Sequence, residues 1–331
     1  MEEKIIKGIK YQLNEEKLTA QVIQKKGYSG DIVIPDTVVS KKVSYKVTSI
    51  EKAAFRDSKS LTSVTIPDGV TCIDGSTFRD CESLTTIMIH DSVNEIGAYA
   101  FDGCKSLTSI NIPNGVTSIK YHAFDGCKSL TSINIPNSVT SIEYCAFCGC
   151  ESLTSINIPN GVTSIENYAF ADCKSLTSIN IPESVTTIGS WTFADCSSLT
   201  TINIPNGVTS IDKYTFLDCK SLTSINIPNS MIFIEDHAFE GCNLASITIP
   251  DGVITIRKGT FKNNESLTSI NIPNSVKMIE EDAFIGCVSL TDIRYNGTIE
   301  QWQKIRLKEY WKLYTPVIVI HCTDGDIEVE D

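Results

Sequence analysis

The hydrophobic positions of the chain recur with a period of 23 residues. Only the step from Phe239 to Phe261 is shorter, because the stretch GCNLASITIP lacks one residue before Leu244. A fixed period of this length is typical of repeat proteins, whose coils stack and share one continuous core. We therefore expect the length of 331 residues to reflect the number of repeats. The phenylalanines that mark the period are Phe55, Phe78, Phe101, Phe124, Phe147, Phe170, Phe193, Phe216, Phe239, Phe261 and Phe284.

Each repeat follows the pattern A-F-x-x-C-x-x-L-x-x-I-x-I-P-x-x-V-x-x-I, as in residues 100–119. The L-x-x-I-x-I part alternates like a short strand whose isoleucines face a core. Pro113 ends this strand because proline has no N–H to continue a ladder, and the Asn-Gly that follows is typical of a turn. The Ala-Phe part is too short for an ordinary helix, so it predicts an irregular or 3₁₀ turn. Stacked repeats then form a parallel sheet with strands about 4.8 Å apart.

The spacing of Leu107, Ile110, Ile112, Pro113 and Phe124 resembles the BspA-like class of leucine-rich repeats across residues 47–296. The resemblance implies a repeat solenoid, a right-handed leucine-rich-repeat superhelix with a parallel β-sheet of short strands. It also implies a bacterial or protist surface protein that adheres to host or microbial partners. The family has no catalytic residues to carry over.

Both ends of the chain depart from the repeat, as the open ends of a stack require. Residues 1–46 predict an N-terminal cap with a partial first repeat and a β-hairpin around NEEK. Between Pro35 and VTSI the chain holds nine extra residues, including Lys41, Lys42 and Tyr45, which predict a protruding loop. Residues 47–296 hold about eleven repeats. Residues 297–331 predict a C-terminal cap, with a capping box that starts a helix and then a closing hairpin. We expect all three parts to form one elongated domain.

Nine of the 13 cysteines occupy the same repeat position, which we name the Cys column. Neighbouring parallel side chains hold their Cβ atoms slightly too far apart for an unstrained disulfide, so the column is expected to be buried and reduced. Reduced thiols suit a cytosol or an anaerobic exterior. The members are Cys81, Cys104, Cys127, Cys150, Cys173, Cys196, Cys219, Cys242 and Cys287.

The stretch CAFCGC, with Cys145, Cys148 and Cys150, has the only metal-like spacing in the chain. Zinc would need a fourth ligand, for which His122 is the one candidate, and Cys150 already belongs to the Cys column. We therefore expect no metal and no cofactor.

One candidate binding surface is the outward face of the predicted strands, where Ser or Thr and Asn alternate with buried isoleucine. Such a uniform strip of hydroxyls and amides, on the concave side of the solenoid, either binds a ligand or satisfies its own hydrogen bonds as a ladder. Its asparagines are Asn111, Asn134, Asn157, Asn180, Asn203 and Asn226.

A second candidate surface lies where the repeats differ most, two or three residues before each phenylalanine. Tyr and Trp combine apolar area with a polar tip, as in protein interfaces and sugar-binding sites. Alternatively, each ring merely covers the turn of its neighbour. The candidate residues are Tyr99, Tyr121, His122, Tyr144, Tyr168, Trp191, Tyr214 and His237.

Charge and motif content narrow the function further. The net charge of −12 disfavours nucleic acid and anionic membranes as partners, and no stretch is apolar enough to insert into a membrane. The start MEEKIIKGIKYQL has no secretory signal, and no phosphate-binding, nucleophile-elbow or metalloprotease motif occurs. We expect a non-catalytic, adhesin-like binding module at the cell surface or secreted, with a host or microbial protein as partner. An intracellular, cytoplasmic scaffold and a carbohydrate-binding module that takes a glycan remain alternatives.

Overall fold

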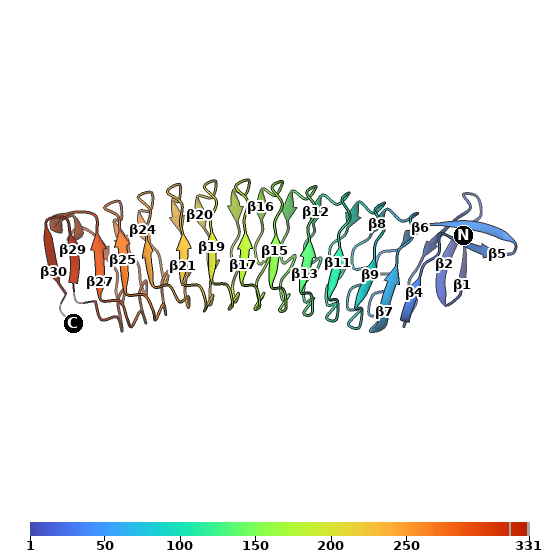
Figure 1. Cartoon of the computed structure of the whole chain (residues 1–331), viewed down its shortest axis with the longest axis horizontal. Helices are drawn as coiled ribbons and strands as arrows, with labels where there is room; N and C mark the ends of the chain where they lie inside the picture. Colours follow the sequence, from blue (N-terminus) through green and yellow to red (C-terminus); the bar gives the residue numbers. More distant parts are fainter. Residues whose placement is uncertain (318, 330–331) are drawn as a thin grey trace. The chain divides into compact units, whose positions relative to one another are not determined.

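The computed structural model describes residues 1–317 and 319–329, and its contacts divide into two compact units, Met1–Val162 and Thr163–Asp331. In both units the chain winds through stacked turns that each add short strands beside those of the previous turn (Figure 1). The repeat is therefore the structural unit, as the 23-residue period predicts.

Unit 1, Met1–Val162, contains fifteen strands. They are β1 (Glu2–Ile6), β2 (Ile9–Asn14), β3 (Thr19–Val22), β4 (Ser29–Val33), β5 (Thr37–Ser40), β6 (Val43–Ile50), β7 (Ser60–Thr65), β8 (Cys72–Ile73), β9 (Thr86–Met88), β10 (Glu95–Ile96), β11 (Ser109–Asn111), β12 (Ser118–Ile119), β13 (Ser132–Asn134), β14 (Ser141–Ile142) and β15 (Ser155–Asn157).

Unit 1 begins with a sheet of order β1-β2-β3-β6-β5. The antiparallel pairs β1–β2 and β2–β3 include the hairpin predicted around NEEK. Residues 37–50, however, form the antiparallel pair β5–β6, so the expectation of a protruding loop is wrong. Lys41 and Lys42 make the turn with φ of 50° and 67°, as a tight hairpin requires, and Tyr45 points into the core, where it is 4% exposed.

The rest of unit 1 consists of parallel ladders. The strands β4, β7 and β9 pair in parallel, as do β11, β13 and β15, while the two-residue strands pair separately as β8–β10 and β12–β14. The register is the same from coil to coil, with Ile110 beside Ile133 and Asn111 beside Asn134. Each repeat thus contributes two short strands, one more than the sequence pattern predicts.

Unit 2, Thr163–Asp331, contains fifteen further strands and one helix within its described residues. They are β16 (Ser164–Ile165), β17 (Ser178–Asn180), β18 (Thr187–Ile188), β19 (Thr201–Asn203), β20 (Ser210–Ile211), β21 (Ser224–Asn226), β22 (Phe233–Ile234), β23 (Ser246–Thr248), β24 (Thr255–Ile256), β25 (Ser269–Ile272), β26 (Met278–Ile279), β27 (Asp292–Tyr295), α1 (Ile299–Trp302), β28 (Arg306–Leu307), β29 (Val319–Cys322) and β30 (Gly325–Glu328).

Unit 2 repeats the same two ladders. The strands β17, β19 and β21 are parallel, and β23, β25, β27 and β29 continue in the same sense until β30 pairs antiparallel with β29. Thr298 begins α1 with the predicted capping box: its side chain accepts from the Gln301 N–H, while the Gln301 side chain accepts from the Thr298 N–H. The predicted helix and closing hairpin are therefore present.

The core of each unit is a column of stacked phenylalanine rings, all of which are fully buried. Consecutive ring centroids lie 5.2–5.4 Å apart from Phe55 to Phe147 and 5.5–5.8 Å apart from Phe170 to Phe284, with interplanar angles of at most 13°. At these distances near-parallel rings are offset, which is a favourable aromatic geometry. The turns that carry the rings are bonded to the next coil, as where the Phe124 N–H donates to the Ala146 carbonyl at 2.9 Å.

Candidate interaction surface

The residue two positions before each repeat phenylalanine has a left-handed backbone. Its φ lies between 53° and 61° in every repeat, although most of these residues have a Cβ. A left-handed conformation costs roughly 1–2 kcal/mol for a residue with a side chain. We name these residues the αL row, and they comprise Ala53, Ser76, Tyr99, His122, Cys145, Tyr168, Trp191, Tyr214, His237, Gly259 and Asp282.

In unit 2 the αL row is a continuous stack of rings. Trp191 lies 5.6 Å from Tyr168 and 4.2 Å from Tyr214, and Tyr214 lies 4.8 Å from His237, with interplanar angles of at most 22°. Beyond His237, the position of Gly259 leaves no room for a side chain, since a Cβ there would lie 2.4 Å from the His237 Nδ1. Because the faces of the inner rings cover each other, the edges of these half-buried rings are what a partner can reach.

In unit 1 the corresponding aromatic residues are more open. Tyr121 and Tyr144 are 45% and 40% exposed, and they stand edge-on to Tyr99 and His122, each with ring centroids 5.2 Å apart. Tyr99 stacks on His122 at 4.7 Å, while the guanidinium of Arg79 lies 4.9 Å from the Tyr99 ring centre. The predicted aromatic residues of unit 1 thus form one cluster, the unit 1 aromatic cluster: Tyr99, Tyr121, His122 and Tyr144.

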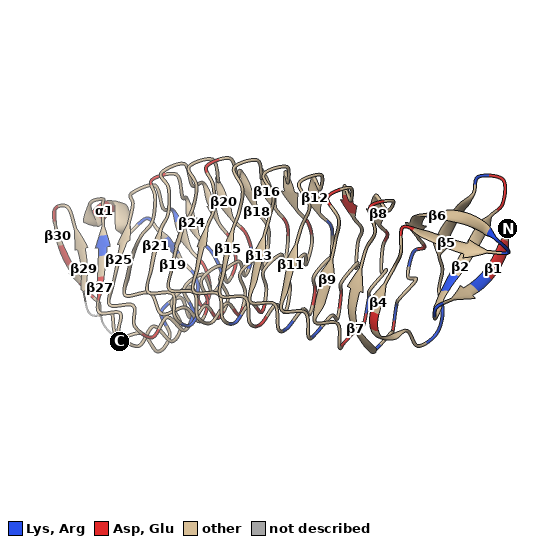
Figure 2. Ribbon diagram, turned by 45° about the vertical axis from the view of Figure 1, so that its right-hand side comes forward, with Lys and Arg blue, Asp and Glu red and all other residues tan. Residues whose placement is uncertain are grey.

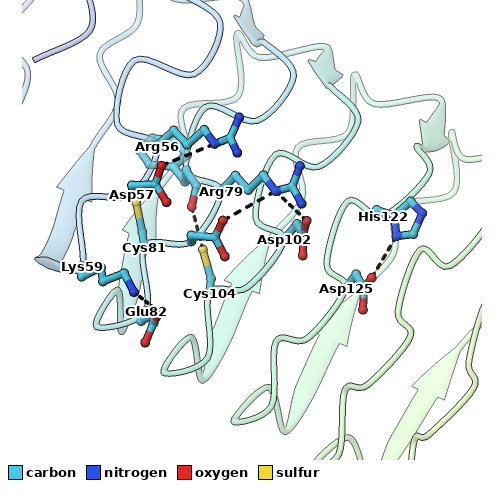
Figure 3. A network of polar contacts seen from close by, with 12 residues as sticks. Arg56, Asp57, Lys59, Arg79, Cys81, Glu82, Asp102, Cys104, His122 and Asp125 are labelled. Carbon is cyan, nitrogen blue, oxygen red and sulfur yellow. Dashed lines mark hydrogen bonds and ion pairs between the residues drawn. The ribbon is translucent and has the colours of Figure 1, made fainter. Parts of the chain in front are cut away.

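Charged side chains line the turns beside this cluster. Figure 3 shows Arg79 reaching toward Asp102, with its Nε 2.9 Å from the carboxylate, and His122 facing Asp125 at 2.8 Å. Burial raises the pKa of Asp102 above its ordinary value even though Arg79 lies against it. Lys59 pairs with Glu82 at 2.9 Å in the same row of turns. The more exposed Lys59–Glu82 pair is of the kind that contributes little to stability.

The strand face is polar and uncharged over most of its length. All six predicted asparagines are exposed, and in Figure 2 the strands β11, β13 and β19 carry no charged residue. Asn226 donates to the Asn203 side chain at 3.2 Å, and Asn271 donates to the Thr248 hydroxyl at 2.9 Å. These two bonds join the side chains of neighbouring coils along this face.

The Cys column is buried, as predicted, and it has a bonding role that the sequence did not indicate. In eight coils the thiol donates to the carbonyl oxygen of the phenylalanine in the preceding coil, at 3.0–3.3 Å. Burial raises the pKa of Cys81 and of Cys287 to about 12. All 13 cysteines are thiols in the structure. Within residues 1–317 and 319–329, no group of three or more metal-ligating side chains could hold a metal ion.

The segment from Tyr310 to Thr315 is a divergent coil that sequence reasoning missed. The Phe284 N–H donates to the Trp311 carbonyl, as the Phe261 N–H does to Ala283, so Lys312 stands where a repeat has its phenylalanine. Thr315 takes the place of a column cysteine and donates to the Phe284 carbonyl at 2.6 Å. The only sign of this coil in the sequence is the spacing between Thr315 and the apolar strand β29, which is similar to the spacing between a column cysteine and the strand that follows it.

An open groove of about 630 Å³ lies on this divergent coil. Tyr310 and Tyr314 on its sides are 61% and 75% exposed, and Val288 from the neighbouring coil is 56% exposed. Trp311 contacts Phe284 edge-on at 6.1 Å, at the end of the phenylalanine column. The groove is lined by Val288, Tyr310, Trp311, Lys312, Leu313, Tyr314, Thr315 and Pro316.

Stacked coils with parallel two- and three-residue strands, buried Leu and Ile rows and polar turns define a leucine-rich-repeat solenoid protein. Residues 36–152, 117–242 and 193–313 match the model of the BspA type leucine rich repeat region. These matches cover most of the sequence, and the chain belongs to the BspA-type leucine-rich repeat family.

Solved structures of bacterial proteins are similar over nearly the whole chain. A leucine rich cell surface protein from Faecalibacterium prausnitzii is 30% identical, with a TM-score of 0.63, over 92% of this chain and 98% of that one. A leucine-rich repeat protein from Bacteroides ovatus is 27% identical, with a TM-score of 0.54, over 96% and 99%. The pneumococcal vaccine antigen PcpA shares the fold at 17% identity, with a TM-score of 0.58, over 97% and 98%. A search of curated proteins returned no match.

The family and the fold are those of leucine-rich repeat proteins, which typically bind other proteins and are typically non-catalytic. Within residues 1–317 and 319–329, no helix combines the length and the apolar character needed to span a bilayer. The fold and the family therefore support a protein-interaction module.

Proposed function

We propose that the chain is an adhesin-like binding module of a bacterial cell surface, and that it engages a host or microbial surface protein. The family assignment supports an interaction role, and the similar protein from Faecalibacterium prausnitzii is described as a cell surface protein. The proposal also includes three structural points. The solenoid winds in a right-handed sense, residues 1–46 and 297–331 cap its ends, and the whole chain is one domain.

The observation that carries the proposal is the exposure of Tyr121 and Tyr144 in the unit 1 aromatic cluster. Tyr121 packs edge-on against Tyr99, and Tyr144 packs edge-on against His122. Because these contacts already restrain both rings, they lose little conformational freedom when a partner binds. Tyr, Trp and Arg dominate the binding energy of protein interfaces, and Arg79 lies beside the cluster. The stacked rings of unit 2 are more covered and are assigned a smaller share of the contact.

The test is the binding of the purified chain to immobilised matrix proteins, measured beside a Tyr121→Ala/Tyr144→Ala variant. Removing two hot-spot tyrosines is expected to weaken binding by about 30-fold or more. The matched control is an Asn111→Ala/Asn134→Ala variant on the strand face of the same coils. If the asparagine variant loses binding and the tyrosine variant keeps it, the partner binds the strand face and the proposed site is wrong.

A carbohydrate-binding role is the second candidate, and the groove between Tyr310 and Tyr314 favours it. Exposed tyrosine rings beside an open groove are suited to stack on sugars. Titration with soluble mucin glycans, followed by the fluorescence of Trp311, tests this role. Glycan binding that survives Tyr310→Ala/Tyr314→Ala excludes the groove as the sugar site.

A further inference from the structure

In two coils the side chain of an αL-row residue contacts the side chain three residues later. His122, in the αL row, places its Nδ1 2.8 Å from the carboxylate of Asp125, three residues later. In unit 2, His237 places its Nδ1 2.6 Å from the carboxylate of Glu240 in the same way. These two pairs show that the repeat brings together the residue two before and the residue one after its phenylalanine.

In the coil that follows His122, the same two positions hold Cys145 and Cys148. The backbone is equivalent: φ is 53° at both His122 and Cys145, and the Cys148 N–H donates to the Cys145 carbonyl at 3.2 Å. A turn of this kind holds its first and fourth Cα atoms within about 7 Å, the range that a disulfide needs. The two thiols are hydrogen-bonded to each other.

The remaining cysteine of this stretch is held differently. Cys150 belongs to the Cys column, is fully buried and donates to the Phe124 carbonyl at 3.3 Å. Cys148 is half-buried at the surface of the turn, and Cys145 is 6% exposed. Hydrogen bonds from Cys148 and Tyr144 lower the pKa of Cys145, whereas burial raises that of Cys150 well above its usual value. Cys145 is therefore a better nucleophile than Cys150.

We propose that Cys145 and Cys148 form a redox-responsive dithiol, which closes to a disulfide when the protein meets a small disulfide oxidant. With oxidised glutathione, the Cys145 thiolate attacks one sulfur of the oxidant, and one glutathione thiolate leaves. Cys148 then loses its proton to water, attacks the Cys145 sulfur and releases the second glutathione. Two protein thiols are oxidised and one disulfide of the oxidant is reduced, so the electrons balance.

This dithiol does not depend on the proposed adhesive role. Closure would lock the turn that begins directly after Tyr144, within the unit 1 aromatic cluster, while the Cys column stays reduced. A single coil of the repeat thereby becomes sensitive to the redox state of the surroundings.

The test is peptide mass mapping of the full chain after incubation with glutathione buffers of increasing oxidised fraction, followed by an acid quench and alkylation of the remaining thiols. We expect the peptide with Cys145 and Cys148 to lose the mass of two hydrogens, and dithiothreitol to restore it. Cys148→Ser is expected to stop at a mixed disulfide of Cys145 with glutathione. Cys150→Ala, the matched control, is expected to close as the wild type does.

Two results would overturn the proposal. One is a wild-type chain that keeps both thiols in fully oxidised glutathione, and the other is a disulfide that includes Cys150 instead. Circular dichroism of each variant verifies its fold, and Cys145→Ser gives a second, independent way to remove the reaction.

Discussion

The side-chain nitrogen of Asn264 donates a hydrogen bond to the carbonyl oxygen of Phe239 at 2.7 Å. Asn264 stands where other repeats have a column cysteine, and its Oδ1 also accepts from the Leu244 N–H at 3.4 Å. In a full-length repeat that N–H is bonded within its own turn, as from Leu222 to Cys219 at 2.9 Å. The one-residue deletion shortens this turn, and the Asn264 side chain of the next coil replaces the bond.

Asn264→Ala is expected to destabilise the chain by about 2 kcal/mol, because it leaves the buried N–H of Leu244 without its partner and removes one of the two hydrogen bonds to the Phe239 carbonyl, which keeps the bond from the Cys242 N–H. Asn264→Cys should fall between the wild type and the alanine variant, since a thiol restores one of the two bonds. The midpoint of urea denaturation measures the order. Asn274→Ala, in an exposed turn, is the control, and equal effects of Asn264→Ala and Asn274→Ala would contradict the assigned role.

Trp191 is expected to tolerate glycine better than alanine. Its φ of 61° costs about 1 kcal/mol for any residue with a Cβ, and both substitutions remove the same ring from between Tyr168 and Tyr214. Trp191→Gly should therefore be about 1 kcal/mol more stable than Trp191→Ala, as measured by denaturation followed with circular dichroism. At Thr187, on strand β18, the order should reverse. A more stable alanine variant at Trp191 would refute the strain argument.

The Cys column is expected to resist alkylation in the native chain. A pKa of about 12 for Cys81 and Cys287 leaves so little thiolate at pH 8 that reaction with iodoacetamide should be slower than in the unfolded chain by about 10³-fold. Mass mapping after timed alkylation, with and without urea, measures this ratio. Native labelling of column cysteines at the unfolded rate would show that the coils open readily.

The stability of the sheet end, formed by strands β29 and β30, is expected to depend on pH through His321. When protonated, its ring donates to the Asp326 carboxylate at 2.9 Å and to the Asp292 carboxylate at 3.1 Å, and these contacts raise the pKa of His321. A raised histidine pKa stabilises the fold below its unfolded value of about 6.5 and ceases to do so as the pH rises through the folded value. Hydrogen bonds from Thr291 and His321 lower the pKa of Asp292, so its contribution is lost as the pH falls below about 4.

Amide exchange of strands β29 and β30 should therefore be slowest between about pH 4 and pH 6.5, after correction for intrinsic rates. His321→Asn keeps a polar side chain but cannot be protonated, and it should remove the alkaline side of this profile. An unchanged profile in that variant would assign the pH dependence to other groups.

The buried rows were predictable because each consists of the same residue type, repeated at a constant spacing. Phe101, Leu107 and Ile110 recur at fixed positions, and repetition leaves no other way to bury them together. The left-handed row was not predictable, since Tyr and Trp do not favour that conformation, and it is imposed by closure of the coil. A second left-handed row did carry a signal: in the coils with a repeat phenylalanine it holds only Asp, Asn and Gly, as at Asp80 and Gly103, which tolerate positive φ.

The candidate site was predictable only as a set of variable positions. The sequence marked His122 and Cys145 as places where repeats differ, but not their contacts with Asp125 and Cys148 across the turn. The divergent coil escaped because Lys312 replaces the phenylalanine by which repeats are recognised. In both cases the missing information is which side chains meet, and neighbouring coils determine that.

The constant register between coils has a consequence for how such a chain changes over generations. Ser109 lies beside Ser132 and Thr201 beside Ser224, and every coil presents the same edge to the next. Unequal recombination between the DNA segments of two repeats would therefore add or delete whole coils while every buried row stays aligned. Gene duplication alone can therefore change the number of coils, and no new set of core residues is needed.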